Sequence, residues 1–239
     1  MENTASVALS SQMVLSQMMD IIANNMANIA TPAFKSESLT FRESLEKAGN
    51  QENLSLVMGG STFSNFAEGP MSTTGGTFDV AIHGDGFFSV GTSQGTRYSR
   101  LGRFQLDSKS MLVTGSGESV LDTGGRPIRI PQQAGEITIA GDGTISTGSG
   151  PVARIAIFDF ENLQALKKVG DGLYETDQTA KLNRDAKVVQ GMVEDSNVNG
   201  VLEMTYLIDV SRAYQAAQKL IEAEFDRQKQ AIDNIPAVS

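Results

Sequence analysis

The segment Gly91-Thr92-Ser93-Gln94-Gly95 matches the G-x-S-x-G pattern that surrounds the nucleophilic serine of many hydrolases. In those enzymes the serine stands on a sharp turn between a strand and a helix, and an acidic residue and then a histidine follow later in the chain. Here the motif lies between two expected strands, and the single histidine, His83, precedes it. We therefore expect an ordinary β-turn at Ser93, and a hydrolase that uses Ser93 is a distant alternative.

Patterns for metal and cofactor binding are incomplete. His83 has no cysteine or second histidine nearby and falls on the outward row of its strand, so we expect a solvated side chain. Asp142-Gly143 and Asp171-Gly172 resemble pieces of calcium loops but lack the ligand series that ends in glutamate. Gly84-x-Gly86 and Gly115-x-Gly117 lack the third glycine and the helix of a dinucleotide loop. We expect no catalytic residue, no metal site and no cofactor.

Three arginines, Arg97, Arg100 and Arg103, form a local basic cluster, with Arg126 and Arg129 downstream. In an acidic protein this cluster favours a set of surface salt bridges. An anchoring patch for a partner is the alternative, because charge contributes to the specificity of association.

The overall charge limits the classes of partner. The chain has 19 Lys and Arg against 28 Asp and Glu, a formal net charge of −9, which argues against nucleic acid. The absence of cysteine excludes a disulfide framework and a thiolate metal site. The first basic residue is Lys35, so we expect no cleavable signal peptide. The most apolar stretch, Met13 to Ile22, contains polar residues, so we expect no membrane span.

Both ends of the chain have helical spacing. In the first segment Ala8, Leu15, Ile22 and Ile29 recur every seven residues, and a second row contains Gln12, Met19 and Met26. Such rows are typical of the seam of a coiled coil or bundle. We expect the asparagines of the run 24–28 to bind free carbonyls or a neighbour. The helix should end near Ala30-Thr31, because Pro32 disfavours helical geometry in the residue before it.

The last segment repeats this organisation. Its apolar residues follow each other at spacings of three and four, from Leu207 through Tyr214 to Phe225. Asn199-Gly200 predicts the N-terminal cap, and Pro236 ends the run.

Between the helices, Gly, Ser and Thr are frequent and apolar residues mostly alternate with polar ones, which predicts strands. Phe78, Val80 and Ile82 predict a half-buried strand that forms a hairpin with 87–90 through the turn Gly84-Asp85-Gly86. Further candidates are 96–100, 103–106, 111–114, 119–121, 127–130, 136–140, 144–146 and 152–158. Their short, regular spacing favours an antiparallel sandwich or barrel.

We therefore predict an α+β fold, in which N- and C-terminal helices pair in a coiled-coil-like bundle and enclose an inserted, antiparallel all-β domain. The expected parts are an N-terminal helix (1–32), a connecting arm of short helical or extended pieces (33–76), a β-rich domain (77–186), a return segment (187–199) and a C-terminal helix (200–239). Paired terminal helices around an inserted body indicate an assembly protein. The expected assembly interface is formed by Leu15, Met18, Met19, Ile22, Asn25, Met26, Asn28, Ile29, Leu207, Val210, Tyr214, Ala217, Ile221 and Phe225.

Several ordered segments of the chain resemble the bacterial flagellar basal-body rod and hook proteins. The similar segments are Asp20 to Lys35, Gly84-Asp85-Gly86-Phe87-Phe88, Tyr98 to Asp107, Gly191 to Val198, and Arg212-Ala213-Tyr214-Gln215-Ala216. Two positions depart from the family pattern: Met26 stands where leucine is usual, and Pro32-Ala33 replaces a Thr-Gly turn. Glycine permits a positive φ and alanine does not, so the replacement puts the local backbone at Pro32-Ala33 in question.

The resemblance implies a structural, non-enzymatic subunit of the rod, the drive shaft that spans the periplasm in the basal body. It implies that the terminal helices form the inner tube and that the β-domain lies outside. The implied partners are other rod subunits, copies of this chain, and the flagellar type III apparatus, which exports such subunits without a cleavable signal peptide. Length and a single modest β-domain are most similar to a proximal-rod subunit, and a distal-rod subunit is the close rival.

One alternative belongs to another class: an oligomeric extracellular binding module, whose β-domain takes carbohydrate or peptide and whose helices only hold the copies together. Closed symmetry and a concave β-face would favour that module, whereas head-to-tail contacts between copies would favour the rod.

Overall fold

The computed structural model describes residues 2–48, 52–131 and 135–233. The chain divides into two compact units. Unit 1 contains residues 1–29, 36–65 and 198–239, and unit 2 contains residues 30–35 and 66–197. The two terminal segments therefore belong to one unit, and most of the sequence between them belongs to the other.

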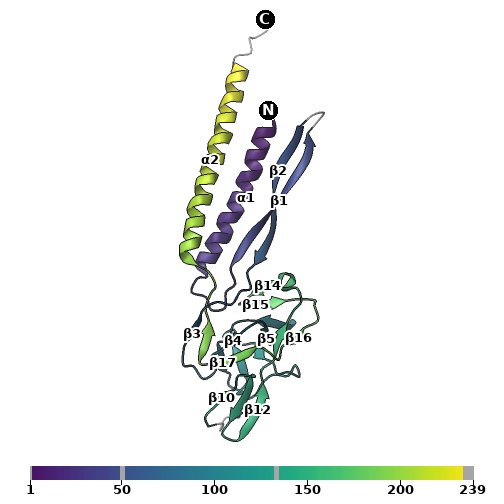
Figure 1. Ribbon diagram of the computed structural model, residues 1–239, viewed down its shortest axis with the longest axis vertical. Coiled ribbons are helices and arrows are strands. Elements are labelled where there is room, and N and C mark those ends of the chain that lie inside the picture. The colour runs from purple at the N-terminus through teal and green to yellow at the C-terminus, as the bar shows by residue number, and fades with distance from the viewer. Residues whose placement is uncertain (1, 49–51, 132–134, 234–239) are drawn as a thin grey trace. The chain divides into compact units, whose positions relative to one another are not determined.

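Unit 1 contains two long helices and one long hairpin (Figure 1). Helix α1 (Glu2–Ala27) packs along helix α2 (Gly200–Asp233), and the hairpin of β1 (Glu37–Ala48) and β2 (Glu52–Ser64) lies alongside α1. The pairing of the terminal helices confirms the predicted bundle. Helix α1 ends three residues before the predicted Ala30, and Asn199 caps α2 as predicted, with its Oδ1 atom accepting from the Leu202 amide at 3.2 Å. Among the described helices, none is long and apolar enough to cross a membrane.

The predicted connecting arm takes a more regular form than expected. We expected short helical or extended pieces at 33–76, and the structure forms the antiparallel hairpin β1–β2, with a register shift between Leu39 and Phe41. Strands of this length escaped recognition because the apolar residues of this segment do not alternate regularly and a charged run, Arg42 to Lys47, interrupts them. The predicted strands 96–100, 103–106 and 144–146 match observed strands within one or two residues.

Unit 2 is built from short antiparallel strands. Their bounds are β3 (Met71–Thr73), β4 (Val80–His83), β5 (Phe87–Thr92), β6 (Gly95–Ser99), β7 (Phe104–Leu106), β8 (Leu112–Thr114), β9 (Ser119–Val120), β10 (Thr138–Ile139), β11 (Thr144–Thr147), β12 (Gly150–Arg154), β13 (Ile157–Asp159), β14 (Lys167–Gly170), β15 (Leu173–Glu175), β16 (Lys181–Leu182), β17 (Lys187–Gln190) and β18 (Met192–Glu194), with a 3₁₀ helix at Leu163–Ala165. The largest sheet has nine strands with the path β14-β15-β6-β5-β9-β8-β7, and β13 and β16 branch from it. The predicted antiparallel class is confirmed.

The predicted hairpin of residues 77–83 with 87–90 is wrong. Strand β4 pairs with β17 of the return segment, whereas β5 pairs with β6, β9 and β13. The predicted alternation in β4 is also wrong, because Val80, Ala81 and Ile82 are all buried. Strand β4 has four residues and is covered on both faces, so its pattern of apolar residues does not indicate which strand pairs with it. Here the partner strand lies more than a hundred residues away.

Two cores lie on opposite faces of β5, because successive side chains of a strand point to opposite sides. Phe88 belongs to an aliphatic core with Val80, Ile82 and Val188. Phe87 belongs to an aromatic core with Phe160, Leu166 and Tyr174, in which ring centroids of neighbouring residues lie 5.8–5.9 Å apart. Strand β5 is therefore the central strand of unit 2.

Ala33 adopts the backbone conformation that is usually left to glycine. Its φ is 56°, its side chain is buried, and its amide donates to the Glu194 carbonyl at 2.8 Å. The turn at Pro32-Ala33 therefore has a left-handed residue at position 33, although an alanine is strained in that conformation.

We expect Ala33→Val to lower the free energy of unfolding of unit 2 by about 1–3 kcal/mol, because a β-branched side chain is poorly tolerated at positive φ. Ala33→Gly, the control, should stay within about 1 kcal/mol of wild type, because relief of strain offsets the larger entropy of the unfolded chain. Urea unfolding of both variants measures the difference. A valine variant as stable as wild type would contradict the assigned conformation.

Candidate functional site

Twelve of the fourteen predicted interface residues lie on α1 and α2, and Asn28 and Ile29 follow the end of α1. Ile22, Asn25 and Val210 are buried, and Ile29 and Phe225 are exposed. The other nine are half-buried, namely Leu15, Met18, Met19, Met26, Asn28, Leu207, Tyr214, Ala217 and Ile221. A single chain therefore covers most of these residues only in part.

On α2 the buried and half-buried positions, apart from Gly200 and Ser211, form a regular heptad stripe. Its members alternate at spacings of four and three and are Glu203, Leu207, Val210, Tyr214, Ala217, Ile221, Glu224 and Gln228. This is the a/d pattern of a coiled-coil seam. Three of its members are polar, so the stripe buries less apolar surface than an aliphatic seam of the same length.

The outer faces of both helices carry apolar side chains in contact with solvent. On α1 the exposed fraction is 54% for Leu9 and 68% for Met13, and on α2 it is 79% for Val201 and 64% for Phe225. Exposed apolar residues gathered on one element are typical of surfaces that meet another protein. A single subunit therefore leaves apolar side chains of both helices uncovered.

Asn25 fixes the register between α1, β1 and α2. Its side chain is only 1% exposed. Its Nδ2 atom donates to the Glu37 carbonyl at 2.8 Å and to Glu203 Oε1 at 3.2 Å, and its Oδ1 atom accepts from the Glu37 amide at 2.9 Å. The prediction that the asparagines of this run bind carbonyls is confirmed at Asn25, and also at Asn28, which donates to the Asn24 carbonyl at 2.9 Å.

The Glu203 carboxyl lies in a less polar environment than a surface carboxylate. Burial raises its pKa, whereas the hydrogen bond from Asn25 acts in the opposite direction. The charged form of the Glu203 carboxyl is disfavoured in the seam, so a cation beside it would stabilise that charged form.

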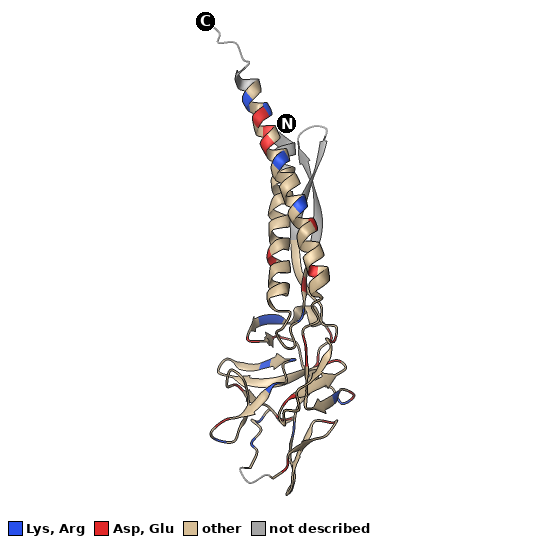
Figure 2. Ribbon diagram, turned by 90° about the vertical axis from the view of Figure 1, so that its left-hand side faces the viewer, with Lys and Arg blue, Asp and Glu red and all other residues tan. Residues whose placement is uncertain are grey.

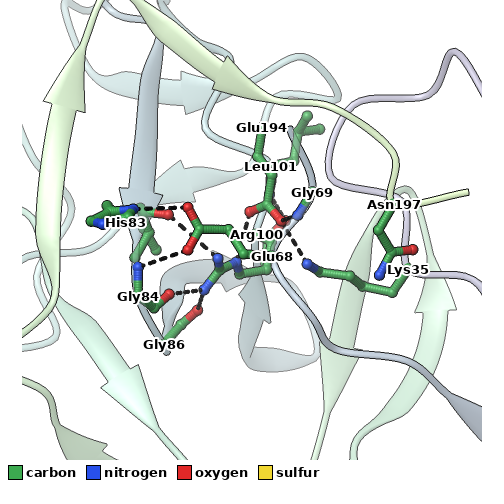
Figure 3. Close-up of polar contacts among 12 residues, drawn as sticks. Lys35, Glu68, Gly69, His83, Gly84, Gly86, Arg100, Leu101, Glu194 and Asn197 are labelled. Carbon is green, nitrogen blue, oxygen red and sulfur yellow. Dashed lines mark hydrogen bonds and ion pairs between the residues drawn. The ribbon is translucent and has the colours of Figure 1, made fainter. Parts of the chain in front are cut away.

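A buried ion cluster holds unit 2 together (Figure 3). Glu194 at the end of β18 is 2% exposed, and its carboxylate accepts from Lys35 Nζ at 2.6 Å, from Arg100 Nε at 2.9 Å and from the Gly69 amide at 2.9 Å. Lys35 and Arg100 are themselves 1% and 4% exposed. One carboxylate thus joins three segments that lie far apart in the sequence.

The remaining donors of the two cations bind backbone carbonyls. Lys35 Nζ donates to the Ala67 carbonyl at 2.7 Å, and Arg100 Nη1 donates to the carbonyls of Gly84 and Gly86, each at 2.8 Å. Burial lowers the pKa of the Lys35 ammonium, and the Glu194 carboxylate opposes that shift. The arrangement satisfies the geometric condition under which buried ion pairs are tolerated, namely further hydrogen bonds to each charged group.

Sequence reasoning did not single out this cluster. We expected Arg97, Arg100 and Arg103 to be a surface set, and that interpretation is wrong for Arg100. Arg97 fits it, with an ion pair to Glu175 at 3.0 Å. The available signal was that Lys35, Arg100 and Glu194 each lie within a segment that resembles the rod and hook family.

The candidate catalytic residues Ser93 and His83 occupy the structural positions that the sequence predicted for them. Ser93 and Gln94 form the turn between β5 and β6, since Thr92 pairs with Gly95. His83 is exposed, and its Nδ1 atom lies 3.0 Å from Glu68 Oε1. Within the described residues, no group of three or more His, Cys, Asp or Glu side chains could hold a metal ion.

Removing the carboxylate with Glu194→Ala should lower the free energy of unfolding of unit 2 by about 3–5 kcal/mol, because two cations would remain buried without an anion. Glu175→Ala removes the partly exposed partner of Arg97 and should cost less than about 1 kcal/mol. Thermal or urea unfolding of the full chain compares the two variants. Equal losses would show that the buried cluster contributes no more than a surface pair.

Glu203→Gln should stabilise unit 1 increasingly as the pH rises above about 4.5. The pKa of Glu203 is raised in the folded chain, so its contribution to stability is present below the unfolded pKa and is lost as the pH rises through the folded pKa. Glutamine keeps an acceptor for Asn25 and removes this loss. Helix unfolding followed by circular dichroism between pH 4 and pH 8 measures the difference from wild type, and a difference that shrinks with rising pH would contradict the assignment.

Comparison with known proteins agrees with the features found in both units. Residues 81–147 match the family described as flagellar hook protein FlgE/F/G D1 domain, and residues 189–234 match the flagellar basal body rod FlgEFG protein C-terminal family. The chain is 38% identical to the flagellar basal-body rod protein FlgF of Caulobacter vibrioides and 34% identical to that of Mesorhizobium japonicum, over the whole of each chain. It is 33% identical to the rod protein FlgG of Bacillus subtilis over 85% of this chain and 88% of that protein.

The matched C-terminal family covers β18 and α2, and the matched D1 family covers β5 to β11. The similarity to whole relatives extends over the terminal helices as well. The chain belongs to the flagellar basal-body rod protein family and is a structural subunit of the rod, not an enzyme.

Proposed function

We propose that this subunit belongs to the proximal part of the rod and joins it through its terminal helices. The observation that carries the proposal is the helix pair of unit 1, which buries one side of each helix and leaves apolar residues on the other. The full-length similarity to relatives named FlgF supports the proximal position, because the similarity to FlgG covers less of both chains.

The proposed interface is the set of fourteen residues predicted from the sequence, with Ile22, Asn25 and Val210 at its centre and Ile29 and Phe225 at its exposed margin. Burying apolar surface stabilises a contact by about 25 cal/mol per Å². The half-buried members gain this contribution only when a further helix covers them. The helices of a free subunit should therefore be less ordered than those of an assembled one.

The proposed partners are other rod subunits and copies of this chain. The proposed route is export through the flagellar type III apparatus without a cleavable signal peptide, to the part of the basal body that spans the periplasm.

The position within the rod is tested by labelling. A tag on this chain, visualised in purified basal bodies, should appear near the inner end of the rod. A label along the outer part would assign the distal rod and overturn the proximal position, while leaving the family unchanged.

Ile22→Asp should abolish rods and motility, because a carboxylate in the seam costs several kcal/mol when it has no partner. Unit 2 has its own cores, so its unfolding transition should not change. Gln17→Glu changes charge at an exposed position of the same helix and should assemble normally. The measurements are motility and the recovery of complete rods. Normal rods from Ile22→Asp would remove the terminal helices from the interface.

A further inference from the structure

Unit 1 contains an apolar pocket of about 310 Å³ between α1, β1 and α2. We call it the acidic pocket. Its lining is mostly apolar and includes Met18, Ile21 and Val210, and it also carries the acidic residues Glu37, Glu203 and Asp209. The volume accommodates one large aliphatic side chain. Because apolar surface in a pocket is stabilised by apolar contact, the occupant should insert such a side chain.

The charges of the acidic pocket indicate which kind of residue should stand next to the inserted side chain. None of the residues that line it is a lysine or an arginine. One of its carboxyls, Glu203, has a pKa raised by burial, so a cation placed near it would stabilise its charged form. The matching ligand is therefore an aliphatic side chain that stands next to a lysine or an arginine.

Helix α2 itself contains an aliphatic side chain next to a lysine, nearer to its C-terminal end. Between Val210 and Ile221 the charged residues are Arg212 and Lys219, both basic, and Leu220 beside Lys219 is 51% exposed. The start of the helix is acidic instead, with Glu203 and Asp209. Figure 2 shows this order along α2, red followed by blue and then both colours near its end.

We propose that the acidic pocket of one subunit receives Leu220 of a second copy of this chain, with Lys219 of that copy beside the pocket carboxylates. A helix cannot fold back on itself, and Leu220 lies ten residues, about 15 Å, beyond Val210 on the same helix. The ligand must therefore come from another copy. The two surfaces differ, so each contact leaves one pocket and one Leu220 free, which is the condition for an open polymer.

This proposal rests on the proposed role of the terminal helices, and it goes further by naming the pocket and its occupant. The second copy is favoured over other rod subunits because the required leucine and lysine stand side by side on this chain, with charge opposite to that of the pocket. A related subunit as the occupant is one outcome of the test.

Cysteine cross-linking tests the contact, since the chain has no cysteine of its own. Tyr206→Cys places a thiol in the lining of the pocket, and Leu220→Cys places one on the proposed ligand. The two positions are fourteen residues apart on one helix, about 21 Å, whereas a disulfide needs Cα atoms within about 7 Å. A bond between them is therefore a bond between copies.

Oxidation of the purified full chain that carries both cysteines should give a ladder of oligomers, and each single variant should give dimers at most. Replacing Leu220→Cys by Leu9→Cys, an exposed position on α1, provides the matched control. The proposal expects at least several-fold more cross-linked product from the Tyr206 and Leu220 pair than from the control pair. Equal yields would overturn it.

Assembly in cells separates this contact from the broader role of the helices. Leu220→Asp should lose rods, whereas Gln215→Asp, an exposed position on the same helix, should keep them. Normal rods from Leu220→Asp together with lost rods from Ile22→Asp would reject the pocket contact and retain the helix interface. Lost rods from Leu220→Asp without cross-linking of the cysteine pair would assign Leu220 to another rod subunit and overturn the choice of a second copy.

Discussion

The carboxylate of Glu194 is the constraint on which the rest of unit 2 depends. It is removed from water, so it needs its two cations, and those cations lie 159 and 94 residues away in the chain. Each partner alone would be a buried charge without compensation, which costs far more than the intact cluster contributes. Unit 2 therefore closes only when its first segment, its central strands and its return segment are present together, a non-local requirement of the kind that slows folding.

The same cluster decides where the chain enters and leaves unit 2. The Ala33 amide donates to the Glu194 carbonyl, and the Asn197 amide donates to the Phe34 carbonyl at 3.3 Å, so the entering and leaving segments are adjacent. Helix α1 ends a few residues before these contacts, and α2 begins a few residues after them. Closing a loop costs less entropy when its ends are already held near each other, so the cluster lowers the cost of pairing two helices that are far apart in the sequence.

The sequence was sufficient for the features whose signals are local. The stripe on α2 from Leu207 to Ile221, the cap at Asn199 and the turn at Ser93 each depend on residues within a few positions, and each was found. The rows predicted for the first helix hold only in part, because Ile29 lies beyond the end of α1 and the buried Val14 stands on neither row. The partner strand of β4 lies more than a hundred positions away and the carboxylate that pairs with Arg100 lies 94 positions away, so the local pattern of residue types indicates neither. Arg100 in particular stands three residues from two other arginines, which is the pattern of a surface set. The long hairpin was missed for a different reason, because its apolar residues lack a clear period of two.

In the seam of unit 1 the register of the two helices is fixed, while apolar side chains of both helices stay exposed. Asn25 and Glu203 place polar atoms at core positions, where they contribute little to stability but allow only the register that satisfies their hydrogen bonds. Helices with an aliphatic seam would be more stable in the free subunit and would need no neighbour. In this chain the polar seam fixes the alignment of α1 and α2, and in the proposed assembly the exposed apolar faces would gain further stabilisation from contacts with other helices. If the subunit is exported as proposed above, it gains from that division, because its terminal helices need not be fully formed until a neighbour covers them.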